Sequence, residues 1–174
     1  MKVIDDFLPL ETFKTVQQFF LSNQIPWYYN DSIAGINTDL DNYQLCYNFF
    51  DIQQPFKESC PCKYSQFIRP VLAKISPKYV LRVKANLRPR TSHMQYCGQF
   101  HTDMKINQYT AIFYLNSNNG YTLFEDDTRV FSKENRLCVF HGHTEHAGAS
   151  CTDQRRRIVL NINYIPNELD PLKF

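Results

Sequence analysis

The histidines and one aspartate of this chain have a spacing that could chelate a metal ion. His101 and Asp103 are two residues apart in the segment "FHTD", so on an extended strand both side chains leave the same face and can converge on one point. Three of the five histidines (His141, His143 and His146) lie within six consecutive positions further along the chain. Antiparallel strands could return one of them to the first pair. We therefore expect a metal site built from two distant segments.

Two histidines and one carboxylate form a specific ligand set. They occupy one face of an octahedron and leave the other positions open, which is the arrangement in non-haem Fe(II) oxygenases. A His-x-Asp pair alone is weak evidence, because such residues are common on protein surfaces. The β-rich run before the histidine cluster and the strand-like segment "RRRIVLNINY" after it strengthen the interpretation.

The elements that must position these residues differ between the two halves of the chain. From about residue 79, short runs rich in β-branched and aromatic residues alternate with turns of Asn, Gly and Asp. Helical spacing is confined to the first half, in an amphipathic helix after Pro9 and a second helix over 63–75 that Pro70 can kink. The pattern predicts a mostly β protein of the α+β class, a jelly-roll core with N-terminal helices packed on one sheet.

The length and composition fit a single globular domain. At 174 residues, with 43% hydrophobic and 15% aromatic residues, the chain can bury one sizeable core. We expect helical support over about 1–78 and the jelly-roll core over about 79–165. The net charge of +2 does not require a polyanionic partner.

The start of the chain and its cysteines indicate a reducing compartment. The segment "MKVIDDFLPLETF" has no apolar run of the length of a signal peptide or a membrane span. We expect a cytoplasmic protein with reduced thiols and no membrane partner. Cys60 and Cys62 do not have the spacing of zinc or thioredoxin motifs. They are interpreted as incidental thiols, with a structural or redox role left open.

The second half resembles the prolyl 4-hydroxylase-like branch of the 2-oxoglutarate and Fe(II)-dependent dioxygenases, including its short stand-alone members from bacteria and viruses. The matching segments lie between about residues 86 and 165 in family order: "FHTD", "TAIFYLN", "NGYTLFED", "NRLCVF", "HAG" and "RIVLNINY". The resemblance implies a cupin-like double-stranded β-helix in a bacterial cell or a virus-infected host cell. It also implies Fe(II), 2-oxoglutarate as cosubstrate and O2, with ascorbate as an optional reductant.

The same resemblance implies a reaction and a substrate class. It predicts a dioxygenase that couples oxidative decarboxylation of 2-oxoglutarate to succinate with hydroxylation of a C–H bond. The expected activity is prolyl hydroxylase-like, on a peptide, a protein or a small molecule. The sequence indicates no oligomeric state.

Carried over residue by residue, the resemblance makes His101 and Asp103 the first two iron ligands. The distal histidine of the family is followed by one residue and a glycine, which selects His146 in "HAG". His143 and His141 remain alternatives, interpreted as loop histidines near the mouth of the site.

The resemblance also suggests how the cosubstrate is bound. Arginine suits a carboxylate because its planar fork makes two charge-assisted hydrogen bonds, and the frame "RIVLNINY" selects Arg157 for the distal carboxylate. Arg155 and Arg156 are interpreted as a solvated basic edge. Tyr114 matches a tyrosine that donates to the cosubstrate, and Asn161 shares a strand face with Arg157. For both, packing or a buried polar ladder is the alternative.

Two other functions are considered. A nucleic acid demethylase of the AlkB type shares the iron triad but carries a second arginine six residues after the first. That position is Asn163 here, so nucleic acid is not an expected substrate. A non-catalytic jelly-roll binding protein is the other alternative, and the presence of all ligand types in order argues against it.

Four basic residues on one predicted strand (Arg82, Lys84, Arg88 and Arg90) could line a substrate path or contact phosphate, but we interpret them as a solvated strand edge.

Overall fold

In the residues that the structure describes, ten antiparallel strands in two sheets form the body of the protein. The computed structural model describes residues 1–30, 43–53, 61–96, 99–104, 106–168 and 172. The larger sheet has the strand order β1-β8-β5-β10-β4-β3-β2 and the smaller one the order β7-β6-β9. The bounds are β1 Lys2–Ile4, β2 Tyr28–Asn30, β3 Gln44–Asp51, β4 Tyr79–Pro89, β5 Tyr109–Tyr114, β6 Tyr121–Phe124, β7 Arg129–Phe131, β8 Arg136–His141, β9 His146–Gly148 and β10 Arg156–Ile165.

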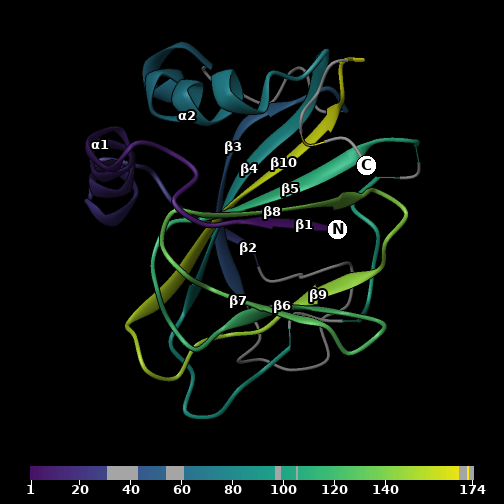
Figure 1. Ribbon diagram of the computed structural model, residues 1–174. Coiled ribbons are helices and arrows are strands. Elements are labelled where there is room, and N and C mark those ends of the chain that lie inside the picture. Colours follow the sequence, from purple (N-terminus) through teal and green to yellow (C-terminus); the bar gives the residue numbers. More distant parts are fainter. Residues whose placement is uncertain (31–42, 54–60, 97–98, 105, 169–171, 173–174) are drawn as a thin grey trace.

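Two helices, α1 (Leu10–Leu21) and α2 (Pro61–Ile75), lie on the side of the large sheet away from the small sheet (Figure 1). The aromatic side chains of α1 that the sequence places on one face are buried, and Phe19 stacks on Phe67 of α2 with ring centroids 3.8 Å apart. Helix α2 continues through Pro70. The predicted jelly-roll architecture with helices on one sheet is therefore confirmed.

Strand β4 shows how the two faces of the large sheet differ. Val83, Ala85 and Leu87 belong to the core between this sheet and the helices. The residues between them point the other way, because successive side chains on a strand alternate in direction. A second, smaller core lies between the sheets and contains Ile112, Tyr114, Phe124, Val130, Cys138, Phe140 and Val159.

Three strands were not predicted from the sequence: β2, β3 and β9. Strand β3 lies in the first half of the chain, where only helical spacing was recognised, yet it pairs along β4 from Leu45 to Asp51. Strand β9 has three residues, too few to show a period. The interpretation of the basic residues of β4 as a solvated edge is wrong, because β4 lies between β10 and β3 inside the sheet.

Within the part of the chain that the structure describes, no helix has the length and apolar character needed to cross a membrane. Cys60 lies outside the described residues, and the prediction for Cys60 and Cys62 stays open.

Candidate metal centre

The structure brings His101, Asp103 and His146 together. One potential ligand atom from each of the three lies within 4.8 Å of the others. His101 and His146 form an isolated antiparallel bridge in which each backbone N–H donates to the other's carbonyl at 3.1 Å. The backbone thus joins the segment after β4 to β9. Two histidines that are 45 residues apart in the sequence thus meet at the site.

Both histidine rings are held in the tautomer that a metal ligand needs. His101 Nδ1 lies 3.2 Å from the carbonyl oxygen of Gln99, and His146 Nδ1 lies 3.2 Å from that of Thr144. A carbonyl oxygen only accepts, so Nδ1–H is the donor in each case. The lone pair of a neutral ring is then on Nε2, and such support of the other ring nitrogen is usual for metal-bound histidine.

Five polar groups surround the carboxylate of Asp103. Arg82 Nη2 lies 2.8 Å from Oδ1. Oδ2 accepts hydrogen bonds from the side-chain amides of Asn161 at 3.0 Å and Asn163 at 3.1 Å, and one from the Thr110 hydroxyl at 3.4 Å. His146 Nε2 lies 3.8 Å from the same oxygen. These contacts fix the orientation of the carboxylate toward the histidines.

The protonation states of the residues at this site favour the binding of a cation. Burial alone raises the pKa of Asp103, but the charges of Arg82 and His146 and the two asparagine amides outweigh it, so the pKa lies well below its usual value. Burial lowers the pKa of His146, despite the opposing charge of Asp103. At neutral pH the site therefore offers an anionic carboxylate and a neutral imidazole, which fits a divalent metal ion of the non-haem iron type.

A cavity of about 190 Å³ opens beside the three residues. Arg157 lines it and is only 5% exposed. Its Nε donates to the Ser132 hydroxyl at 2.8 Å, and its Nη2 lies 3.3 Å from the Thr122 hydroxyl oxygen. Gly120 allows this placement, because a Cβ atom there would lie 2.7 Å from Arg157 Cδ. The cavity thus has a fixed cation beside the candidate metal ligands, as a dicarboxylic keto acid would require.

The three consecutive arginines have different surroundings. Arg155 is exposed. Arg156 is half-buried, and its Nη2 lies 2.6 Å from the Leu21 carbonyl at the end of α1. The prediction that Arg156 belongs to a solvated edge is wrong, since carbonyl groups at a helix end attract a cation. Only Arg157 of the three lines the cavity.

The other two predicted cosubstrate residues lie in different positions. Asn161 lines the cavity and holds Asp103. Tyr114 is fully buried in the small core, outside the described lining of the cavity. Its hydroxyl lies 2.8 Å from Thr122 Oγ1, and its ring centroid lies 5.6 Å from Arg157 Cζ. It therefore supports two residues that line the cavity, and direct contact with a cosubstrate stays a prediction.

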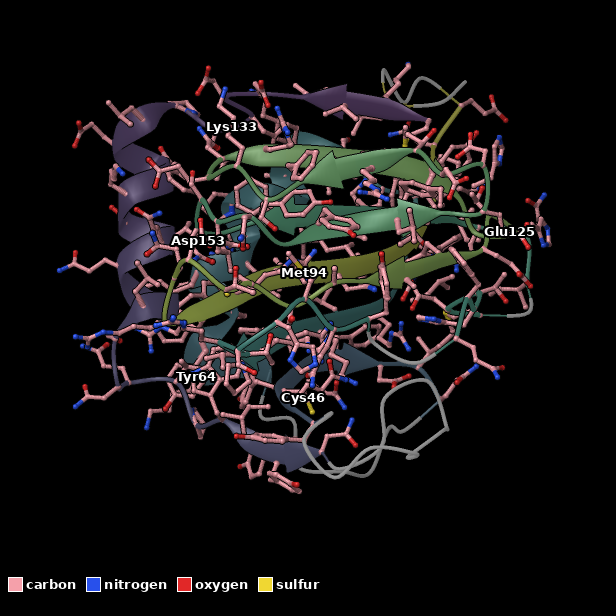
Figure 2. All side chains as sticks on the ribbon, turned by 90° about the horizontal axis from the view of Figure 1, so that it is seen from below. Cys46, Tyr64, Met94, Glu125, Lys133 and Asp153 are labelled. Atoms are coloured by element: carbon pink, nitrogen blue, oxygen red, sulfur yellow. The ribbon has the colours of Figure 1, made fainter. Side chains whose placement is uncertain are left out.

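His141 and His143 lie away from the three candidate ligands. Both are exposed and line a separate cavity with residues that include Phe124 and Glu125. His141 Nε2 lies 3.3 Å from the Tyr109 hydroxyl. Figure 2 labels Glu125, which lies on the side of the molecule opposite α1. Neither histidine belongs to a group of described residues that could hold a metal.

Sequence reasoning did not assign several residues of the site. Arg82, Asn163 and Thr110 hold Asp103, and Thr122 and Ser132 hold Arg157. Asn163 occupies the position of the second arginine of AlkB-type enzymes, where it donates to the carboxylate instead. Asn161 and Asn163, on the same strand face as Arg157, were a signal in the sequence for part of these contacts.

Comparison with known proteins agrees at the level of fold. No protein-family model and no curated protein sequence matches the chain. Among solved structures, a Trichoplax adhaerens prolyl hydroxylase in complex with a hypoxia-inducible factor peptide fragment superposes with a TM-score of 0.62 at 14% identity, over 94% of this chain and 82% of that one. A viral collagen prolyl hydroxylase from Paramecium bursaria Chlorella virus-1, in a 2-oxoglutarate complex, gives 0.55 at 17% identity, over 94% and 96%.

A third solved structure widens the comparison. The α-ketoglutarate-dependent non-haem epimerase SnoN of nogalamycin biosynthesis gives a TM-score of 0.60 at 12% identity, over 94% of this chain and 76% of that one. The protein therefore has the fold of the 2-oxoglutarate- and iron-dependent oxygenases that includes the prolyl 4-hydroxylases. Because this fold also includes an epimerase, fold alone does not define the reaction.

Proposed function

We propose that this protein is a non-haem Fe(II) dioxygenase that uses 2-oxoglutarate to hydroxylate a C–H bond. One observation carries the proposal. His101, Asp103 and His146 offer ligand atoms within 4.8 Å of one another, with both ring Nδ1 atoms bound to carbonyl oxygens. Two histidines and one carboxylate are the ligand set of these enzymes. The neighbouring cavity, with its buried Arg157, supports the choice of cosubstrate.

Each residue has a defined role in this proposal. The three ligands would hold Fe(II), while Arg82, Asn161 and Asn163 keep Asp103 ionised and oriented. Arg157 would bind the distal carboxylate of 2-oxoglutarate, with Ser132 and Thr122 fixing its guanidinium. Bound iron and 2-oxoglutarate would supply, with O2, the oxidising chemistry that releases succinate and CO2. The apolar side chains of Ile112 and Val159 also line the cavity and limit access of water.

The proposed reaction is prolyl hydroxylase-like, on a peptide, a protein or a small molecule. Support comes from the structural similarity to prolyl hydroxylases, one of which is in complex with a peptide. Ascorbate would serve as an optional reductant.

Wild-type protein with Fe(II) and 2-oxoglutarate under anaerobic conditions is expected to develop a weak visible absorption band. The band arises when a keto acid chelates Fe(II), so it reports metal and cosubstrate binding without any knowledge of the substrate. Titration by absorption spectroscopy measures it. Folded protein without the band would refute the proposed function.

Substitution of Arg157 is expected to weaken 2-oxoglutarate binding. Arg157→Lys keeps the charge but loses the fork, and Arg157→Met loses both. Because charge-assisted hydrogen bonds are lost, the concentration of 2-oxoglutarate that half-saturates the protein should rise about 10- to 100-fold, and more for the methionine variant than for the lysine variant. The same titration measures it. The exposed Arg155 provides the matched control. If Arg155→Met changed the affinity for 2-oxoglutarate as much as Arg157→Met does, the assignment would be contradicted.

A further inference from the structure

Strand β4 directs a row of polar and basic side chains into the cavity. Arg82, Lys84, Asn86 and Arg88 alternate with the core residues of β4 and all line the cavity. We call these four residues the cationic row. They lie beside β10, where Lys84 is the register partner of Asn161 and Arg88 that of Arg157. A row of this kind on a central strand is costly to bury without partners.

The members of the row differ in their contacts. Arg82 is paired with Asp103 at 2.8 Å, and Arg88 donates to the Gln95 carbonyl oxygen at 3.2 Å. For Lys84, by contrast, no hydrogen bond or ion pair within 4 Å involves its ammonium among the residues that the structure describes. Lys84 is half-buried, and burial lowers its pKa, while the charges of Cys46, Asp103 and Asp51 raise it in part. Among the residues that the structure describes, no carboxylate oxygen therefore lies within 4 Å of its ammonium nitrogen.

The amide oxygen of a neighbouring side chain also lacks a partner. The side-chain oxygen of Asn86 is buried and has no hydrogen bond, although Asn86 lines the cavity between Lys84 and Arg88. Cys46, labelled in Figure 2, is the register partner of Asn86 on β3. Buried polar groups are normally satisfied. An ammonium without a partner on a cavity wall indicates a ligand with an anionic oxygen, and the unpaired Asn86 oxygen, which only accepts hydrogen bonds, indicates an N–H or O–H donor on the same ligand.

The proposed metal and cosubstrate do not neutralise this row. A divalent cation and a dicarboxylate keto acid cancel in charge, and the distal carboxylate is assigned to Arg157. Among the described residues that line the cavity, Asp103 is the single carboxylate, and Arg82 already pairs with it. The charge of Lys84 therefore remains after both have bound.

We propose that the cationic row binds an anionic group of the substrate, a carboxylate or a phosphate, with the Lys84 ammonium as the main contact and the Asn86 side-chain oxygen as the acceptor for a donor group of the same substrate. The inference rests on the proposed function, because it identifies the anion as part of the molecule that is oxidised. The proposal predicts that the substrate is a small anionic molecule and not the uncharged interior of a peptide chain.

Calorimetric titration of protein loaded with Mn(II) and 2-oxoglutarate tests the proposal, because the filled cosubstrate site leaves only the row for a second anion. The probes are inorganic phosphate and N-acetyl-L-proline, with the neutral N-acetyl-L-prolinamide for comparison. Lys84→Met is expected to weaken anion binding about 10- to 100-fold, the usual range for a lost charge-assisted hydrogen bond. Lys84→Arg, which keeps the charge, should restore it to within about threefold of wild type.

The outcomes distinguish a phosphate from a carboxylate as the bound group. They also distinguish failure of the anion site from failure of the proposed function. Lys84-dependent binding of phosphate indicates a phosphoryl group, and Lys84-dependent binding of the proline carboxylate over its amide indicates a carboxylate. If neither anion distinguishes wild type from Lys84→Met, the proposal is overturned. It is also overturned if Lys84→Met abolishes the absorption of the Fe(II)–2-oxoglutarate complex, because the row would then belong to the cosubstrate site. A wild-type protein that lacks this absorption, but binds anions through Lys84, would refute the proposed function and leave the anion site standing.

Discussion

Replacement of His146 by alanine is expected to abolish the visible absorption of the Fe(II)–2-oxoglutarate complex. His146 is 4% exposed and presents Nε2 toward Asp103 at 3.8 Å, so its loss removes one of three ligand atoms. Loss of a group that only orients a ligand typically costs 10- to 100-fold in metal affinity. Loss of the ligand itself should cost at least about 100-fold. Anaerobic titration with Fe(II) and 2-oxoglutarate, together with a direct assay of bound iron, measures the effect.

His143 provides the matched control for this prediction. It lies three positions before His146, in the turn that precedes β9, but is exposed and lines a different cavity. His143→Ala should bind iron and develop the band as the wild type does. The His146→Ala variant should still fold, because the backbone hydrogen bonds between residues 101 and 146 do not require the imidazole. A band that survives in His146→Ala but disappears in His143→Ala would reverse the ligand assignment.

Local sequence was sufficient to single out the three candidate ligands that the structure brings together. The pair His101 and Asp103 could be recognised because a spacing of two places side chains on one face of an extended chain. The choice of His146 depended on its "HAG" context. The structure places His146 beside the pair and keeps His141 and His143 apart.

The contacts that support the ligands could not be read from the sequence in the same way. Arg82 lies 21 residues before Asp103, and Asn163 lies 60 residues after it. They meet the carboxylate because β4 and β10 are neighbours in register, with Arg82 opposite Asn163. Such pairing depends on the whole sheet, which no local pattern specifies.

The same reason explains the error over the basic residues of β4. Alternation of charged and apolar residues predicts a strand with one face in water, and an exposed edge is the usual place for charge. In this protein the polar face of β4 lines an internal cavity instead. A sequence period shows that two faces differ, but the neighbouring strands determine whether the polar face meets solvent or a ligand.

Replacement of Arg82 by methionine is expected to destabilise the metal-free protein by about 3 kcal/mol, because it leaves the Asp103 carboxylate without its close cation. The side chains of Arg82 and Asp103 are 19% and 6% exposed. Water can therefore do little to solvate the carboxylate that has lost its partner. For a chain of this length the loss corresponds to a fall of roughly 10 °C in melting temperature. Arg90→Met, at an exposed position just beyond β4, should change stability by less than about 0.5 kcal/mol.

The pH dependence of the same variant follows from the direction of the Asp103 pKa. In the wild type the folded-state pKa is depressed, so the ionised carboxylate contributes stability above its unfolded pKa. This contribution is lost as the pH falls through the folded pKa. Without Arg82 the folded pKa rises, so most of the difference in stability between wild type and Arg82→Met should disappear at acidic pH. Thermal melts of metal-free protein between neutral and acidic pH measure this convergence.

A divalent metal should compensate for the missing arginine. Mn(II) bound at the site places a new cation beside the carboxylate, so it should raise the melting temperature of Arg82→Met by more than that of the wild type. This result would show that Arg82 substitutes for the metal charge in the empty protein and keeps Asp103 ionised until the metal binds. Equal stabilisation of both proteins by Mn(II) would mean instead that Asp103 and Arg82 form a structural ion pair to which the metal does not couple.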